Sequence, residues 1–283
     1  MSGVLERTLG LLELLAQHPE GLPLRQIVEK LAIPASAAHR LLGQLGARGY
    51  VRQARDQGDY VLTSKLVAMA LDFMGASGMV DFAQPVLDRL AASSGDFIRL
   101  AVVDGERLTW VARAQGARRG LRYDPDNDAA ARLSCTATGH AWLMTMSDEE
   151  ALGLVIRQGF GRPEEYGPSA PTTAAQLLKI LAEARKRGYG MTIDMFGPGL
   201  ASIAVPLRRA GESPVGILSI AGPSVRLTAE RMRALLPSLK EAAREIAVAS
   251  TTSPLFASRR MEPDDPEPGR WKAGEARAAA RSR

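Results

Sequence analysis

The sequence is poor in the residues that build disulfide frameworks and metal centres, with one cysteine and three histidines among 283 residues. A lone Cys135 cannot form an internal disulfide. His18, His39 and His140 are too far apart in the chain to have metal-ligand spacing. We therefore expect no metal, no cofactor and a reducing, cytoplasmic environment.

Long apolar runs are also absent. No stretch approaches the roughly 18 consecutive apolar residues that a membrane helix needs. Glu6 and Glu13 interrupt the apolar residues of the N-terminal segment, which does not have the pattern of a signal peptide. We expect no association with a membrane, and the length suits two domains of the usual ~150 residues.

A large charge excess of one sign is missing as well. The formal net charge is +5, but the first 65 residues carry eight basic and six acidic side chains. Net charge alone is therefore weak evidence for a nucleic-acid partner, and the positions of the basic residues must decide.

Three short helices and a hairpin are predicted for the first 62 residues. Apolar residues at helical spacing predict helices over 4–17, 24–31 and 35–48. In the first helix the predicted core face includes Leu5, Leu9, Leu12 and Ala16, and it is widened by Leu11 and Leu15. Two strand-like segments, 50–52 and 60–62, flank a polar turn. This order is typical of a winged helix-turn-helix domain.

The third helix has an outward face suited to the major groove of DNA. The side chains there are small or able to form hydrogen bonds, namely Ser36, Ala37, His39 and Arg40. Such residues let a recognition helix approach the bases and reach base edges and phosphates. Arg25, Arg52 and Arg55 are expected to contact phosphates. The alternative is that these are solvated arginines on an ordinary three-helix domain.

The rest of the chain predicts a linker helix and then an α+β domain with a largely antiparallel sheet. Strands are expected at 97–104, 107–114, 120–123, 192–195, 201–209 and 215–222, with helices over 81–93, from Ser134, over 173–188 and over 228–250. We predict a winged helix-turn-helix domain at 1–63, a linker helix at 64–80, a second domain at 81–250 and a disordered tail at 251–283.

Several segments resemble the IclR family of bacterial regulators, and the resemblance covers about residues 3–250. It is carried by LERTLGLLELLAQHPEGLPLRQIVEKLAIPASAAHRLLGQLGARGYV, by SCTATGHAWL, by ARKRGYGMTIDMFGPGLASIAVP and by GILSIAGPSVRLT. It implies a GAF-like effector-binding domain as the second domain. It also implies a dimer or dimer of dimers, a palindromic operator of double-stranded DNA, and a small effector that is often acidic or aromatic.

The resemblance further implies effector contacts at Leu121, Tyr123, Ala137, Thr138, Thr192 and Ser202. The chain departs from the family pattern at His140, commonly Lys, and at Ser202, often Cys, and it has Asp194-Met195 where an acidic pair is usual. The helix predicted from Ser134 would offer free N–H groups over 136–139, where we expect the carboxylate of an aromatic or keto acid. The alternative is a plain helix cap.

Two other classes of function stay open, an enzyme or stand-alone metabolite-binding protein and a protein-interaction adaptor. A catalytic Cys135 would need a base within reach, but His140 lies about 140° around the predicted helix. We therefore expect no catalytic residues. A long exposed apolar stripe would favour the adaptor. Trp110 and Trp142 are predicted to be core residues.

Overall fold

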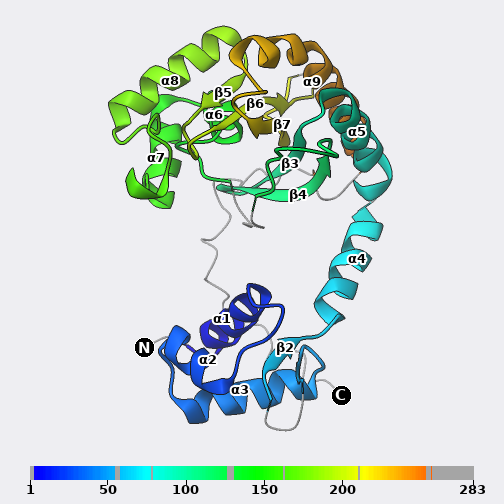
Figure 1. The fold of residues 1–283 in the computed structure, drawn as a ribbon, viewed down its shortest axis with the longest axis vertical. Helices are drawn as coiled ribbons and strands as arrows, with labels where there is room; N and C mark the ends of the chain where they lie inside the picture. Colours follow the sequence, from blue (N-terminus) through cyan, green and yellow to red (C-terminus); the bar gives the residue numbers. More distant parts are fainter. Residues whose placement is uncertain are drawn as a thin grey trace, which may run out of the picture. The chain divides into compact units, whose positions relative to one another are not determined.

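The computed structural model describes residues 3–54, 58–77, 79–125, 131–161, 163–209, 211–252 and 256. The chain divides into two compact units, 1–77 and 78–283 (Figure 1). Among the described residues, no helix is both long enough and apolar enough to span a membrane.

The first unit is a winged helix-turn-helix. Its elements are α1 (Val4–Ala16), α2 (Leu24–Leu31), α3 (Ala35–Ala47), β1 (Val51–Gln53), β2 (Tyr60–Leu62) and α4 (Lys65–Ser77). The strands pair antiparallel, with Val51 opposite Leu62. The core joins α1, α2 and α3 to β1 and consists of Leu11, Leu15, Leu22, Ile27, Leu41, Leu42, Leu45 and Val51. This confirms the fold predicted for the N-terminal part.

The entry into α2 is tied to the wing. Leu22 and Tyr60 exchange two backbone hydrogen bonds, at 3.1 and 2.8 Å. Gly21 precedes this bridge with φ +96°, and a Cβ there would lie 2.6 Å from Cγ1 of Val61. Only glycine suits both the backbone angle and the close approach.

The second unit contains a five-stranded antiparallel sheet, which confirms the predicted α+β class. Its strands follow the order β4-β3-β7-β6-β5, and every neighbouring pair is antiparallel. The bounds are Phe97–Asp104 for β3, Arg107–Gln115 for β4, Gly190–Ile193 for β5, Leu200–Leu207 for β6 and Gly216–Pro223 for β7.

Helices cover both faces of this sheet. The helices α5 (Met79–Ser94) and α9 (Ala229–Ala249) pack against each other and against one face, and α6 (Ala137–Leu143) packs on the other (Figure 1). Beyond α6 lie α7 (Asp148–Gln158) and α8 (Ala174–Arg187), and two short 3-10 helices span Pro163–Glu165 and Ser250–Thr252. Side chains alternate along β3, so Arg99 and Ala101 share the α6 face.

Two predictions for the second unit differ from the structure, and one of its helices was not predicted. Residues 120–123 do not form a strand, because Arg226 Nη1 donates to the Leu121 carbonyl and Gln115 Nε2 to the Tyr123 carbonyl, each at 2.9 Å. The helix predicted from Ser134 begins at Ala137, since the Thr136 hydroxyl caps it by accepting from Gly139 N. The helix α7 was not predicted.

The C-terminal segment is described only in part. Phe256 is buried, and its ring centroid lies 5.9 Å from that of Phe82 on α5. The remainder of the predicted tail, residues 253–255 and 257–283, lies outside the described residues.

Candidate functional site

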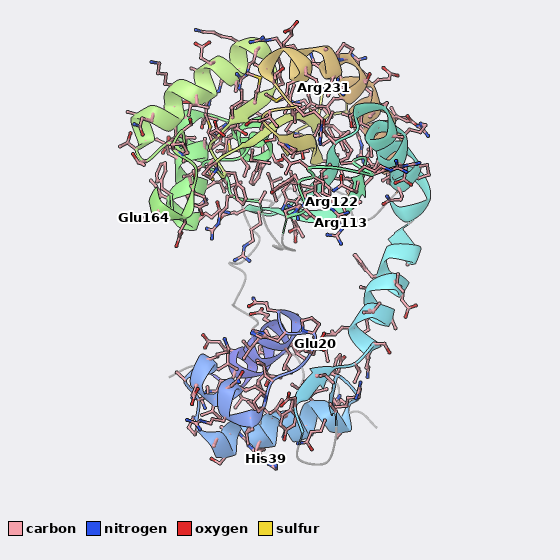
Figure 2. The ribbon with its side chains drawn as sticks, in the orientation of Figure 1. Glu20, His39, Arg113, Arg122, Glu164 and Arg231 are labelled. Carbon is pink, nitrogen blue, oxygen red and sulfur yellow. The ribbon has the colours of Figure 1, made fainter. Side chains whose placement is uncertain are left out.

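The first candidate surface is the outer face of α3. Ala38, Leu41 and Leu42 are buried in the core of the unit, which orients the opposite side of the helix outward. Ser36, His39 and Arg40 are exposed, and Ala37 is half-buried at the edge. Figure 2 shows His39 on the side of α3 that faces away from α1 and α2. The residues predicted for base contact therefore form one continuous surface over the first two turns.

Two predicted phosphate contacts, Arg25 and Arg52, are exposed. Arg25 lies in the first turn of α2, where its Nε donates to Glu29 at 3.0 Å. An exposed i,i+4 ion pair contributes only about 0.3–0.5 kcal/mol, so a phosphate can displace it. Arg52 projects from β1. Arg55 lies outside the described residues.

The second candidate site is a cavity of about 50 Å³ between the sheet and α6. Its lining comes from four strands, the start of α6 and the segments beside them. The described lining residues are Arg99, Trp110, Tyr123, Ala131, Arg132, Thr136, Thr138, Phe196, Leu200, Ser202, Ser219 and Ala221. Three aromatic rings, five hydroxyl groups (one of them the Tyr123 phenol) and two guanidinium groups are thus combined, without a carboxylate among the described lining residues.

Strand register brings the polar groups of the cavity together. Arg99 on β3 lies opposite Ser219 on β7, and Ser202 on β6 lies opposite Thr192 on β5. The hydroxyl groups of Thr192 and Ser202 are 2.9 Å apart. The Arg99 guanidinium carbon lies 4.3 Å from the Trp110 ring centroid, a cation–π contact.

The structure brings together some of the predicted effector residues and separates others. Tyr123, Thr138 and Ser202 line the cavity, and Thr192 contacts it through Ser202. The Leu121 side chain is 65% exposed, and Ala137 is buried within the core under α6. Neither of these two lines the cavity.

Sequence reasoning missed Arg99, Trp110, Phe196 and Ser219 as lining residues. Trp142 is a core residue as predicted, whereas Trp110 is half-buried at the cavity wall. The sequence could have indicated a functional role for Arg99, because it is the one charged residue before Asp104 in the otherwise apolar strand FIRLAVVD.

The predicted anion-binding site at the start of α6 attracts an anion only weakly. This helix has seven residues, and Thr136 already caps Gly139 N at 2.9 Å. Two helical turns sum few peptide dipoles. A full guanidinium charge, as on Arg99, attracts an anion more strongly than such a helix end does.

Cys135 and His140 are buried and do not form a catalytic pair. Burial raises the pKa of the Cys135 thiol to about 11, which keeps it protonated and unreactive. The His140 ring is bonded through Nε2 to the Ser134 carbonyl at 2.7 Å. Over the described part of the chain, no group of three or more His, Cys, Asp or Glu side chains can hold a metal ion.

Comparisons with known proteins agree with this architecture. The domain profile described as "IclR helix-turn-helix domain" matches residues 4–55, and "Bacterial transcriptional regulator IclR C-terminal" matches residues 74–248. The regulator BhcR of Paracoccus denitrificans is 30% identical, covering 86% of this chain and 85% of its own length. The acetate operon repressor of Salmonella typhimurium is 26% identical, covering 87% and 89%.

Solved structures show the same fold. An IclR regulator from Alicyclobacillus acidocaldarius is 20% identical with a TM-score of 0.74, covering 88% of this chain and 99% of its own. An IclR homologue from Microbacterium hydrocarbonoxydans, solved with 4-hydroxybenzoate, is 21% identical with a TM-score of 0.73, covering 89% and 100%. With both domain profiles matched over most of its length, this chain belongs to the IclR family of DNA-binding transcriptional regulators.

Proposed function

We propose that this regulator binds a small organic acid in the cavity between its sheet and α6, and that the bound acid changes its affinity for a palindromic operator. The observation that carries the proposal is the chemistry of the cavity wall. Two guanidinium groups and several hydroxyls surround an aromatic-walled space, and no described lining residue is acidic. Apolar walls with few polar anchors are typical of small-molecule sites.

The size of the cavity favours a short acid. Its volume of about 50 Å³ is a third of the ~150 Å³ of an engineered apolar cavity that admits benzene. A 2-oxo acid of roughly two to four carbon atoms suits this space. An aromatic acid is the second candidate, supported by Trp110, Tyr123 and Phe196 in the wall and by the 4-hydroxybenzoate bound to the Microbacterium homologue. It would require the cavity to widen.

The effector contacts we propose are Tyr123, Thr138, Thr192 and Ser202, which the earlier expectation shares, together with Arg99 and Ser219. In this proposal Leu121 and Ala137 contribute to effector binding only through backbone groups or by packing behind the cavity wall. A thermal-shift screen of pyruvate, glyoxylate, 2-oxobutyrate, benzoate and 4-hydroxybenzoate tests the proposal. We expect at least one acid to raise the melting temperature. If none of them does so at millimolar concentration, the effector is not a small acid of these types.

On the DNA side, we propose that α3 enters the major groove. Ser36, Ala37, His39 and Arg40 would face base edges, and Arg25 and Arg52 would bind phosphates. The exposure of both arginines and of the polar residues of α3 supports this assignment. Several curated relatives are named repressors, which supports repression as the mode of control.

A second copy of the chain is the partner we propose for the exposed apolar side chains of α1 and α4. The predicted core face of α1 is confirmed at Leu11 and Leu15, which are buried. It is wrong at Leu5 and Leu9, which are 73% and 48% exposed. The helix α4 also has exposed apolar side chains, namely Val67, Met69, Leu71 and Phe73. Apolar surface of this kind needs a partner. A palindromic operator needs two DNA-binding units, which favours self-association over an adaptor role.

A further inference from the structure

Arg99 occupies an unusual place for a charged residue. It lies in the middle of β3, the second strand of the sheet, between Ile98 and Leu100, which are both fully buried. Because side chains alternate along the strand, Arg99 points to the α6 face, where the cavity lies. The half-buried Arg99 therefore brings a charge from the sheet to the wall of the cavity.

A bulge in the sheet places an aromatic ring beside this charge. The register between β3 and β4 shifts between Leu100 and Ala101, so that Ala101 pairs with Trp110 while Leu100 pairs with Ala112. The bulge brings Trp110 next to the Arg99 guanidinium at 4.3 Å, and the Phe97 ring lies 5.7 Å away. The plane and position of the guanidinium are therefore restricted by two rings, and less ordering is needed when a ligand binds.

Neutral hydroxyl groups are among the described residues that line the cavity with Arg99. Ser219 lies directly opposite on β7, and its hydroxyl donates to the Arg99 carbonyl at 3.4 Å. Ser202 and Thr138 line the same space. The second cavity arginine, Arg132, is exposed and precedes α6, so water screens its charge more. The two arginines thus differ in burial and orientation although both line the cavity.

We propose that Arg99 is the specificity-determining residue of the cavity and makes it select a carboxylate over a neutral group of the same shape. This inference rests on the proposed function of the cavity as the effector site. The guanidinium, held against Trp110, donates parallel hydrogen bonds to the two carboxylate oxygens. The hydroxyls of Ser202, Ser219 and Thr138 hydrogen-bond the remaining polar atoms of the ligand. A lysine cannot reproduce the planar fork or the stacking on the ring.

Matched acid and amide probes test this assignment. Isothermal titration compares pyruvate with pyruvamide and 4-hydroxybenzoate with 4-hydroxybenzamide, on the wild-type chain and on Arg99→Met and Arg132→Met. We expect the wild-type chain to prefer one of the acids over its amide by roughly tenfold or more. Arg99→Met should reduce that preference to about onefold, mainly by weakening the acid. Arg132→Met should keep the preference within about threefold of wild type.

Each outcome decides the proposal. An acid preference retained in Arg99→Met, or lost equally in both variants, overturns the role of Arg99 while leaving the cavity as the effector site. Failure of the wild-type chain to bind any of these acids contradicts the small-acid effector itself, and with it the role of Arg99. If Arg99→Met does not fold by circular dichroism, Arg99→Lys replaces it. The lysine variant keeps the charge and stem, and full acid preference in it overturns the proposal.

Discussion

At the scale of single residues, the buried imidazole of His140 makes stability depend on pH. Its Nε2 must donate to the Ser134 carbonyl, because a carbonyl oxygen only accepts, and its Nδ1 is buried without a hydrogen-bond partner among the described residues. Protonation would place a charge in the core. Burial therefore lowers the pKa of His140 from 6.5 to about 4, with a smaller contribution from Arg187.

The sign of the effect follows from proton binding. As the pH falls below 6.5, His140 becomes protonated in the unfolded chain. In the folded chain it stays neutral until the pH reaches about 4. The free energy of unfolding should therefore fall as the pH is lowered from 6.5 to 4, by up to about 3 kcal/mol from this residue. Urea unfolding at several pH values gives the free energy of unfolding as a function of pH. Its slope against pH between 6.5 and 4 should be shallower in His140→Gln than in wild type. His39→Gln, an exposed control, should keep the wild-type slope, and equal slopes in all three proteins would contradict the assignment.

Arg40 is the residue of α3 whose long, exposed side chain best suits a base edge. We expect Arg40→Ala to weaken operator binding by ~1–3 kcal/mol at fixed salt, if it forms a specific base contact. The fold should be unchanged, because the side chain is exposed. Fluorescence anisotropy with a selected operator duplex measures the loss. Arg48→Ala, at the far end of α3, is the matched control, and equal effects of the two substitutions would remove Arg40 from the base contacts.

At the scale of elements, periodicity predicted the helices of the first unit well. The predicted helices 24–31 and 35–48 correspond to α2 at Leu24–Leu31 and α3 at Ala35–Ala47. Local sequence suffices there because each helix buries one regular apolar face. Thr173 and Gln176 likewise form the predicted capping box of α8.

Features that depend on tertiary contacts were not predictable in the same way. Residues 120–123 have strand-like composition, but side chains of Arg226 and Gln115 occupy the carbonyls that a neighbouring strand would need. The contact between Arg99 and Trp110 depends on a bulge in the sheet, and no residue pattern in either strand specifies that register. Among the strand residues that line the cavity, Ser202 was therefore predicted through the family resemblance, whereas Arg99, Trp110 and Ser219 were not.

Arg226 links the segment 116–125 to Asp96, the residue before β3, through side-chain hydrogen bonds. Its Nη2 and Nε donate to Oδ1 of Asp96 at 2.6 and 3.0 Å, and its Nη1 donates to the Leu121 carbonyl. Asp96 is fully buried, whereas the Arg226 side chain is 34% exposed. Removing the guanidinium would leave a buried carboxylate without its charge partner, which costs roughly 3 kcal/mol.

We therefore expect Arg226→Met to lower the free energy of unfolding by about this amount, and to speed amide exchange in residues 116–125 beyond the change elsewhere in the sheet. The double variant Asp96→Asn with Arg226→Met should lose less stability than the sum of the single variants, because the two groups are coupled. Additive losses with uniform exchange would show that this contact does not hold the segment.

At the scale of the whole molecule, the exposed apolar residues of α1 and α4 should produce a stable dimer or a dimer of dimers. Sedimentation at micromolar concentration should show no species near 30.3 kDa, the mass of one chain. One charged substitution on each helix, Leu5→Glu with Leu71→Glu, should shift the population toward monomer and weaken binding to a palindromic duplex. Val225→Glu, at an apolar residue of the second unit that is 81% exposed, is the control. A monomeric wild-type chain would contradict the proposed assembly.

The central claim is that occupancy of the cavity changes operator affinity. A ligand can do so only by the difference in its own affinity for the two states, commonly 1–3 kcal/mol or about 5–150-fold. The most direct measurement is anisotropy titration of a selected palindromic duplex, with and without the acid that the thermal screen identifies, on wild type and on Thr138→Trp. The acid should change the wild-type dissociation constant by about fivefold or more. Thr138→Trp, which fills the cavity, should bind the duplex as wild type does and show no response. A wild-type response in Thr138→Trp would place the effector outside this cavity.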